Sequence, residues 1–439
     1  MEEAKNSSRV KVHSILSVVS SNPIQPGKVH KLSLLDQSMG LHTLHIVFYY
    51  NSNPFNDGPM PSDIDNLRAS LSHLLDKYPI ATGRLTRGGP EGHWQVKCND
   101  AGVRMLEASV SATLDEWLRS ADVLEERGLT AWEDMPHDPS FWSPFRIQIN
   151  NFKCGGLAIG LSCTHMHADI TSATLLMKSW TQVHCNLPLT HSPIFHLPQP
   201  PTPSLKNSTP SFSPSKMGTA TMKFSHSVIH KRLSLVQNHC PNATPFDVLV
   251  ALLWSRIALW QEPEPDKNHN RSLSICVDSR NHGRPPIPYS YFGNALHFSV
   301  LSMDGDKLIR GGLGQVCEYV HQHIEGLKRD DFCLEVEGEG PFRVYGPRLT
   351  FINTEHMVDV ENGEGVMYDA VFDKGEKPVH VSYHVGNVVG EGLIMVLPSS
   401  EGGLGRTVTV TLPEEQIANL CKDQAILDLE PIMLISGKK

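Results

Sequence analysis

Long apolar runs, paired cysteines, basic clusters and internal repeats are all missing from this sequence, and each absence excludes a class of protein. No run reaches the ~18 consecutive apolar residues of a membrane-spanning helix, so we expect no transmembrane segment. The net charge is −9 and no basic run offsets it, which argues against nucleic acid as a partner. Scattered cysteines without a Cys-x-x-Cys pair, after the charged start Met1–Lys5, predict a reducing, cytoplasmic setting.

Length and proline content predict how the chain divides. The 439 residues exceed one compact core, which stops growing near ~250–300 residues. Residues 188–218 are rich in proline, serine and threonine, a composition that suits an extended crossing between domains. We therefore predict an N-terminal domain over residues 1–187 and a C-terminal domain over residues 219–439.

Hydrophobic periodicity predicts an α/β fold. In the N-terminal half, Ser62 is a favourable N-cap for a helix that ends at Pro79, and residues 157–162 are a continuous apolar run typical of a buried strand. In the C-terminal half, Thr244 caps an apolar helix and residues 271–278 predict a strand. Further strands are expected over residues 42–50, 145–152, 219–229, 348–354, 378–385, 392–397 and 406–412, and further helices over residues 173–180 and from Pro413.

The segment Thr164–Asp169, directly after the apolar run, combines two histidines with a carboxylate at a place where sites are commonly built. Three interpretations are open. One of the histidines could be a hydrogen-bonded packing residue. His165, His167 and Asp169 could project to one side of an extended chain and bind a metal ion. Alternatively, one histidine could act as a general base while the aspartate orients the loop.

The sequence lacks further metal ligands, which weakens the metal interpretation, and it lacks a serine nucleophile, which excludes one class of hydrolase. The pattern resembles the start of binuclear zinc hydrolases, but these need a histidine where this sequence has Ile170, and no second cluster has ligand spacing. A Gly-x-Ser-x-Gly elbow is also absent, so a serine hydrolase would lack its nucleophile. We therefore expect no metal, and favour a base that deprotonates an alcohol or amine as it attacks an activated acyl carbon.

The pattern His165-x-x-x-Asp169, preceded by Gly-Leu-Ala-Ile-Gly-Leu, resembles the motif of the BAHD family of plant acyl-CoA-dependent acyltransferases. Further landmarks follow in the family's order along almost the whole chain, which makes the resemblance specific. They are Leu32–Asp36, Leu67–Leu71, Tyr78–Leu85, Cys98–Val103, Thr244–Phe246, Val277–Arg280 and Tyr291–Ala295.

This resemblance implies two chloramphenicol-acetyltransferase-like domains, each a mixed sheet with helices, and a channel between them. Acyl-CoA would enter from one face as co-substrate and a small-molecule acceptor from the other, with no permanently bound cofactor. His165 would be the general base, while Asp169 would pair with Arg280 and hold the loop. Gly293 and Asn294 belong to a motif that shapes the channel, whereas His167 has no family role and is expected to be structural.

The chain departs from the family at its second motif, Asp-Phe-Gly-Trp-Gly. Here Phe372 and Gly375 match, whereas the lead aspartate, the first glycine and the tryptophan are replaced. Upstream, where the family has Ser-Trp or Thr-Trp, Thr350 or Asn353 is the candidate donor to the developing oxyanion. Losing one such donor lowers rates by about 10²–10³-fold, so this departure bears directly on turnover.

Together with Phe152–Gly156 and Tyr345-Gly346, the altered motif resembles the eceriferum/Glossy-type branch of the family, which is associated with cuticular wax biosynthesis. That branch implies elongation of very-long-chain acyl-CoA beside a fatty acid elongase condensing enzyme at the endoplasmic reticulum. Two functions are therefore expected as alternatives: acyl transfer by His165, or a non-catalytic accessory role that binds the condensing enzyme. In both cases we expect a monomer that reaches the membrane only through a partner.

Overall fold

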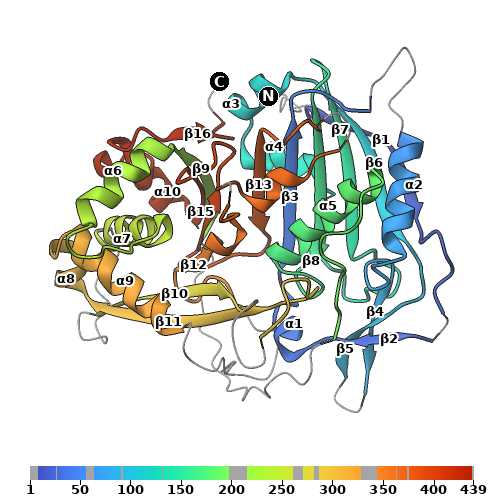
Figure 1. Cartoon of the computed structure of the whole chain (residues 1–439), viewed down its shortest axis with the longest axis horizontal. Coiled ribbons are helices and arrows are strands. Elements are labelled where there is room, and N and C mark those ends of the chain that lie inside the picture. The colour runs from blue at the N-terminus through green and yellow to red at the C-terminus, as the bar shows by residue number, and fades with distance from the viewer. Residues whose placement is uncertain are drawn as a thin grey trace, which may run out of the picture.

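Two large sheets with helices packed on them make up the structure, a computed structural model (Figure 1). The predicted α/β class is confirmed. The predicted N-cap Ser62 and much of the proline-rich segment 188–218 lie outside the described residues. The structure describes residues 8–25, 27–55, 64–89, 92–131, 133–196, 215–260, 270–280, 286–327, 344–361, 363–372 and 375–437.

The first sheet has the strand order β1-β6-β7-β8-β3-β13, and a small sheet with the order β2-β5-β4 lies apart from it. The strands of the first sheet are β1 (Val10–Val18), β3 (Thr43–Tyr50), β6 (Val103–Val110), β7 (Phe145–Phe152), β8 (Leu157–Thr164) and β13 (His380–Val385). The small sheet contains β2 (Val29–Lys31), β4 (Arg84–Gly88) and β5 (His93–Lys97). The helices of this half are α1 (Leu34–Ser38), α2 (Ile64–Leu75), α3 (Leu114–Ser120), α4 (Val123–Glu126), η1 (Arg127–Leu129) and α5 (Ile170–His184).

Strands β3 and β8 are buried along their whole length because both faces of the first sheet are covered. On one face, Leu44, Ile46 and Phe48 belong to the cluster that includes the apolar side of α2 and α5. Side chains of the opposite parity, such as Val47, pack with Trp117 of α3 on the other face. The continuous apolar run predicted as a buried strand is therefore the centre of this sheet.

The second sheet has the strand order β11-β10-β12-β14-β15-β9-β16. Its strands are β9 (Met217–Phe224), β10 (Asn270–Asp278), β11 (Leu296–Asp304), β12 (Thr350–Asn353), β14 (Leu393–Pro398), β15 (Arg406–Pro413) and β16 (Ile432–Leu434). The helices of this half are α6 (His226–Val236), α7 (Pro245–Ala258), α8 (Gly305–Arg310), α9 (Leu313–Leu327), η2 (Glu355–Met357), η3 (Val366–Asp369), α10 (Glu414–Leu420) and α11 (Gln424–Leu427).

Capping side chains decide where two elements of the second half begin and end. Thr244 forms the expected cap of α7, in a capping box with Asp247. The strand predicted over residues 219–229 is too long, because the Ser225 hydroxyl accepts from the Val228 N–H and starts α6 directly after β9.

One strand from the C-terminal half of the chain belongs to the first sheet. Strand β13 follows η3 in the chain, yet it pairs antiparallel with β3 and is the edge of the first sheet (Figure 1). All six of its residues are buried, and its pairing supplies the ladder that β3 would otherwise lack on that side. The C-terminal half therefore contributes a strand to the N-terminal sheet, which joins the two halves through main-chain hydrogen bonds.

The parallel strands β10 and β12 end at the same edge of the second sheet. That edge faces the turn between β8 and α5, so segments distant in sequence meet there. Ends of parallel strands are common places for binding sites. In the described part of the chain, no helix combines the length and apolar character that crossing a bilayer requires.

Candidate active site

The predicted His-x-x-x-Asp segment forms the turn between β8 and α5. The main-chain N–H of His165 donates to the carbonyl of His42, which holds the start of the turn. Asp169 is the N-cap of α5, and its Oδ1 accepts from the Ser172 N–H at 2.8 Å. The side chains of His165 and Asp169 are both fully buried, so each needs partners inside the protein.

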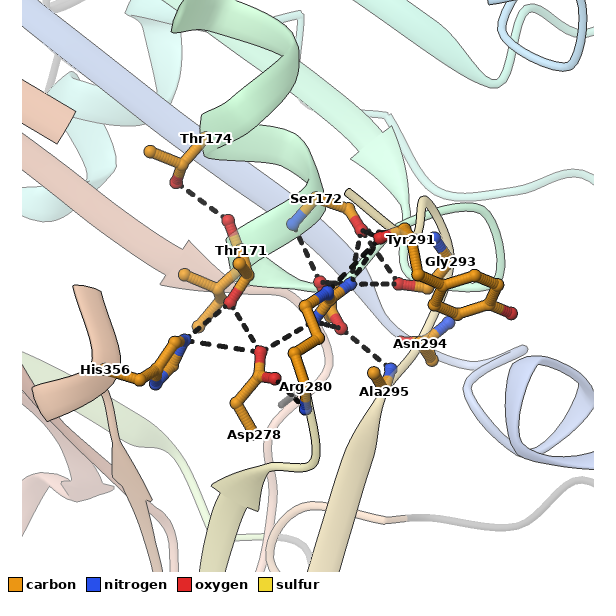
Figure 2. Close-up of polar contacts among 12 residues, drawn as sticks. Thr171, Ser172, Thr174, Asp278, Arg280, Tyr291, Gly293, Asn294, Ala295 and His356 are labelled. Atoms are coloured by element: carbon orange, nitrogen blue, oxygen red, sulfur yellow. Dashed lines mark hydrogen bonds and ion pairs between the residues drawn. The ribbon is translucent and has the colours of Figure 1, made fainter. Parts of the chain in front are cut away.

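Arg280, which follows β10, meets Asp169 across the boundary between the two sheets. The Asp169 oxygens lie 2.8 and 3.1 Å from its two terminal nitrogens, so the ion pair expected from the sequence is present in a fork geometry. The second Asp169 oxygen also accepts from the Ala295 N–H at 2.9 Å. Other guanidinium N–H groups donate to the Ser172 hydroxyl and to the carbonyls of Tyr291 and Gly293 (Figure 2).

A second carboxylate, Asp278 at the end of β10, shares the same guanidinium. Its Oδ2 lies 2.6 Å from Arg280 Nη1, accepts from the Thr171 hydroxyl at 2.7 Å, and lies 3.3 Å from His356 Nε2 (Figure 2). Burial alone would raise the pKa of Asp278, but the charges of Arg280 and His356 hold that pKa below its ordinary value. Asp278 therefore stays ionised, and its bonds to Arg280 and Thr171 help to fix the geometry of the turn.

Asn294 ties the histidine turn to the N-terminal part of the chain. Its Nδ2 donates to the carbonyl of His165 at 2.7 Å and to Oδ1 of Asp36 at 2.8 Å. Asp36 also forms a capping box with Ser33 at the start of α1. Burial raises the pKa of Asp36, and the hydrogen bonds from Asn294 and Ser33 oppose that shift. Asn294 thus positions the main chain of His165 from the second half of the protein.

The imidazole of His165 contacts Tyr345, which lies on the segment before β12. Its Nε2 atom lies 3.0 Å from the Tyr345 hydroxyl oxygen. Burial lowers the pKa of His165, although the charge of Asp169 and nearby main-chain carbonyls act in the opposite direction. The imidazole is therefore neutral near pH 7, which is the form that accepts a proton from an alcohol.

A cavity of about 10 Å³ lies beside Tyr345. This volume is close to the smallest that holds one water molecule. Tyr345 lines the cavity and also bonds His165, whereas His165 itself is not among the lining residues. The polar part of the lining consists of Thr171, Asp278, Asn353, Thr354 and His356.

Comparison with known proteins identifies the family. A model described as the Transferase family matches residues 9–427 of this chain. The chain belongs to this family, the BAHD transferases. Because the match spans both sheets, the two halves together form one BAHD unit.

Curated BAHD relatives align along most of the chain. Protein ECERIFERUM 2 of Arabidopsis thaliana is 26% identical over 441 residues, covering 92% of this chain and 95% of its own length. Hydroxycinnamoyltransferase of Narcissus pseudonarcissus is 25% identical, covering 87% of this chain and 91% of its own length. The predicted resemblance to the BAHD family and to its eceriferum branch is confirmed.

Solved structures show the same fold. Vinorine Synthase superimposes with a TM-score of 0.74 at 20% identity, covering 96% of this chain and 98% of that protein. TRI101 of F. sporotrichioides, complexed with Coenzyme A and T-2, gives a TM-score of 0.67 at 16% identity, covering 93% and 100%. At these identities the likeness establishes the shared two-domain architecture.

The two candidate oxyanion donors, Thr350 and Asn353, are the first and last residues of β12. The Thr350 hydroxyl donates to the carbonyl of Arg348 at 3.0 Å, so its proton is already used. Asn353 lines the cavity, and its Oδ1 accepts from the Glu355 N–H at 2.9 Å. Asn353 is therefore the better placed of the two, and its role as a donor stays a prediction.

The two matching residues of the second BAHD motif lie in different surroundings. Phe372 is buried in an aromatic cluster, with its ring centroid 5.1 Å from Trp180 and 5.2 Å from Phe55. Gly375 is exposed at a φ of +71°, where a side chain would be strained and would contact nothing. These contacts give Phe372 a packing role and Gly375 a turn role, and neither supports the predicted place in the channel.

Gly293 and His167 have local structural partners. A Cβ on Gly293 would lie 2.7 Å from the Tyr291 hydroxyl, so only glycine fits this close approach. His167 Nδ1 lies 2.7 Å from the Thr164 hydroxyl, and its ring packs edge-on against Phe145. Among the described residues, no group of three or more histidine, cysteine or carboxylate side chains is arranged to hold a metal ion.

Several residues of this site were not singled out from the sequence, among them Asp36, Asp278 and Tyr345. Asp36 and Asp278 lie inside quoted motifs, so a carboxylate within each motif was a readable signal. Tyr345 was used only as part of the resemblance to the eceriferum/Glossy-type branch. Its contact joins residues 180 positions apart, which no local spacing reveals.

Proposed function

We propose that this protein transfers an acyl group from acyl-CoA to a hydroxyl or amine acceptor, with His165 as the general base, in very-long-chain or cuticular wax metabolism. The observation that carries this proposal is a buried, neutral imidazole whose Nε2 already contacts a hydroxyl group at 3.0 Å. In the proposed reaction, the acceptor hydroxyl would take the place of the Tyr345 phenol beside His165 Nε2. The contact supports the proposal, because a general base has to lie within hydrogen-bond reach of the proton it removes.

The reaction follows from this geometry. The acceptor O–H gives its proton to His165 Nε2 as its oxygen bonds to the thioester carbon, which forms a tetrahedral intermediate. The C–S bond then breaks, and the CoA thiolate takes the proton from the imidazolium, so the histidine returns to its neutral form. The Asp169–Arg280 pair and Asn294 act as positioning groups, because their hydrogen bonds go to the turn and to each other.

The test is acyl transfer by the purified protein with short-chain and very-long-chain acyl-CoA and a panel of alcohols and amines, followed by CoA thiol release. We expect His165→Ala to lower turnover by about 10²–10⁴-fold, the usual contribution of a positioned base. His73→Ala is the matched control, because His73 is exposed at the end of α2. Equal turnover of the His165→Ala and unchanged proteins would refute the proposal.

Two observations favour a second function: the Tyr345 hydroxyl already contacts Nε2 of His165, and eceriferum proteins are among the relatives. In this alternative the protein binds acyl-CoA or the condensing enzyme of a fatty acid elongase and lengthens its products without covalent chemistry. The altered segment 371–375 and the closed surroundings of His165 support it. Co-expression with a condensing enzyme in yeast distinguishes the two: longer acyl chains that persist with His165→Ala favour the accessory role. Either function implies that the protein is cytoplasmic and that a partner holds it at the endoplasmic reticulum.

A further inference from the structure

The hydroxyl of Tyr345 contacts Nε2 of His165, which is the atom that would accept the proton in the proposed reaction. A neutral imidazole has one nitrogen lone pair in the ring plane, and the Nε2 atom that would carry it faces the Tyr345 hydroxyl. We propose that Tyr345 is the residue that decides which acceptor reacts, because its hydroxyl fills the acceptor's place and an external acceptor has to displace it. This inference rests on the proposed function, since it assigns the acceptor side of the same site.

Both groups keep their neutral forms at this contact. Burial raises the pKa of Tyr345 well above its ordinary value, so the phenol keeps its proton. Burial lowers the pKa of His165, so the imidazole is neutral at neutral pH. In the tautomer that carries its proton on Nδ1, the phenol donates to Nε2, in the same sense in which an acceptor alcohol would donate before it is deprotonated.

The position of the Tyr345 ring is set by packing on several sides. The ring lies edge-on to His42 with centroids 5.0 Å apart, and to Phe298 with centroids 5.8 Å apart. The next residue, Gly346, has a φ of +108°, and a Cβ there would overlap the carbonyl of Val389. Both the ring and its backbone are therefore tightly confined, and the side chain is fully buried.

The small cavity lies against Tyr345. Its lining residues Val277, Asn353 and His356 are half-buried, so the cavity lies close to the protein surface. Its polar side chains suit a hydroxylated molecule, but its volume admits only one water. We expect loss of the Tyr345 ring to open room beside His165 Nε2, because the phenol and the imidazole are in contact. The acceptor class that we infer from the polar lining and the small volume is a small alcohol.

Two substitutions separate the effects of the ring and of its hydroxyl. Tyr345→Ala removes the ring and should raise transfer to small alcohols such as ethanol and glycerol by at least about tenfold. Tyr345→Phe keeps the ring and should raise it by only about fivefold, the factor that corresponds to one neutral hydrogen bond. Tyr319→Phe is the matched control, because Tyr319 is a half-exposed tyrosine of α9 that donates to the Ser302 carbonyl.

A second experiment measures the accessibility of the His165 imidazole and does not depend on acyl transfer. Diethyl pyrocarbonate modifies accessible imidazole nitrogens, and peptide mass spectrometry reports the extent at each histidine. We expect His165 to react slowly in the unchanged protein, and at least about tenfold faster in Tyr345→Ala, whereas exposed His73 reacts at one rate in all variants.

The outcomes are distinct. Rapid modification of His165 in the unchanged protein overturns the inference, because Nε2 would then not be blocked. The inference also fails if Tyr345→Phe, folded by its thermal unfolding curve, loses turnover to the level of His165→Ala, since Tyr345 would then carry the proton. Faster modification in Tyr345→Ala without transfer by any variant supports the blocking role, and refutes the proposed transferase function alone.

Discussion

Replacement of Arg280 by methionine leaves two buried carboxylates without their cation. Arg280 lies within 2.8 Å of one oxygen of Asp169 and within 2.6 Å of one oxygen of Asp278, and the three side chains are at most 2% exposed. Methionine matches the length of the arginine stem but brings no charge and no donors. The substitution therefore tests the charge of the cluster while it preserves much of the packing.

The expected loss of stability is large. Removal of one partner from a buried ion pair costs about 3–5 kcal/mol, because the remaining charge stays desolvated. Here one guanidinium serves two carboxylates, so we expect a loss of about 5 kcal/mol at pH 8. A typical domain has only ~5–15 kcal/mol of unfolding free energy, so this variant should be strongly destabilised.

The loss should depend on pH with a definite sign. In the unchanged protein the pKa of Asp278 is held below its unfolded value, so its stabilising contribution is present above that value and disappears as pH falls through the folded pKa. Without Arg280, burial raises the carboxyl pKa instead, and protonation relieves the penalty as pH falls. The difference in unfolding free energy between the two proteins should therefore shrink from pH 8 to pH 5.

Urea unfolding followed by tryptophan fluorescence at pH 5, 6, 7 and 8 measures this difference. The matched control is Arg310→Met, because Arg310 forms a surface pair with Asp306 in which both side chains are about 80% exposed. We expect no measurable shift of its urea midpoint. A loss in Arg280→Met that is the same at every pH would refute the reasoning, because lost packing alone does not titrate.

Two further substitutions test the positioning and packing roles. Asn294→Ala removes hydrogen bonds to the His165 carbonyl and to Asp36, so we expect a loss of about 2–4 kcal/mol in urea unfolding; an unchanged midpoint would contradict the bridging role. Phe372→Ala opens a cavity beside Trp180, so we expect a loss of about 3–5 kcal/mol and an unchanged acyl-chain preference of the folded protein; a changed preference would place Phe372 at the substrate.

Much of the fold could be predicted from local patterns. The run 157–162 and the strand 145–152 were found because fully buried and alternating strands have distinct periodicities, and Thr244 marked its helix through capping chemistry. Strand β13 was expected as a strand, but the sheet to which it belongs was not predicted. Its residues carry the alternation and burial of any strand, whereas its pairing with β3 is decided by contacts more than 300 positions away in sequence.

For the site, as for the fold, the local patterns were predictable and the long-range contacts were not. The motif residues His165 and Asp169 were readable because they follow a buried strand, and the partner Arg280 came from the family resemblance. Tyr345 was not readable as a site residue, because one aromatic residue after a loop is more often core than catalytic, and only the folded chain brings it to the imidazole. Local chemistry thus pointed to the candidate base, and tertiary packing showed that Tyr345 contacts it.

Presence of the motif does not by itself distinguish an enzyme from an accessory protein of the same fold. The Asp169 carboxylate accepts from Ser172, Ala295 and twice from Arg280, so this residue is needed to hold the turn whether or not any acyl group is transferred. Arg280 is bound in the same way to both halves of the protein. The imidazole of His165, in contrast, is joined to the described structure through the Tyr345 hydroxyl, and its main chain is held independently by Asn294. Selection for the fold alone would preserve Asp169 and Arg280 but would place little demand on the imidazole. The contact between His165 and Tyr345 is therefore the place at which substitutions distinguish the two proposed functions.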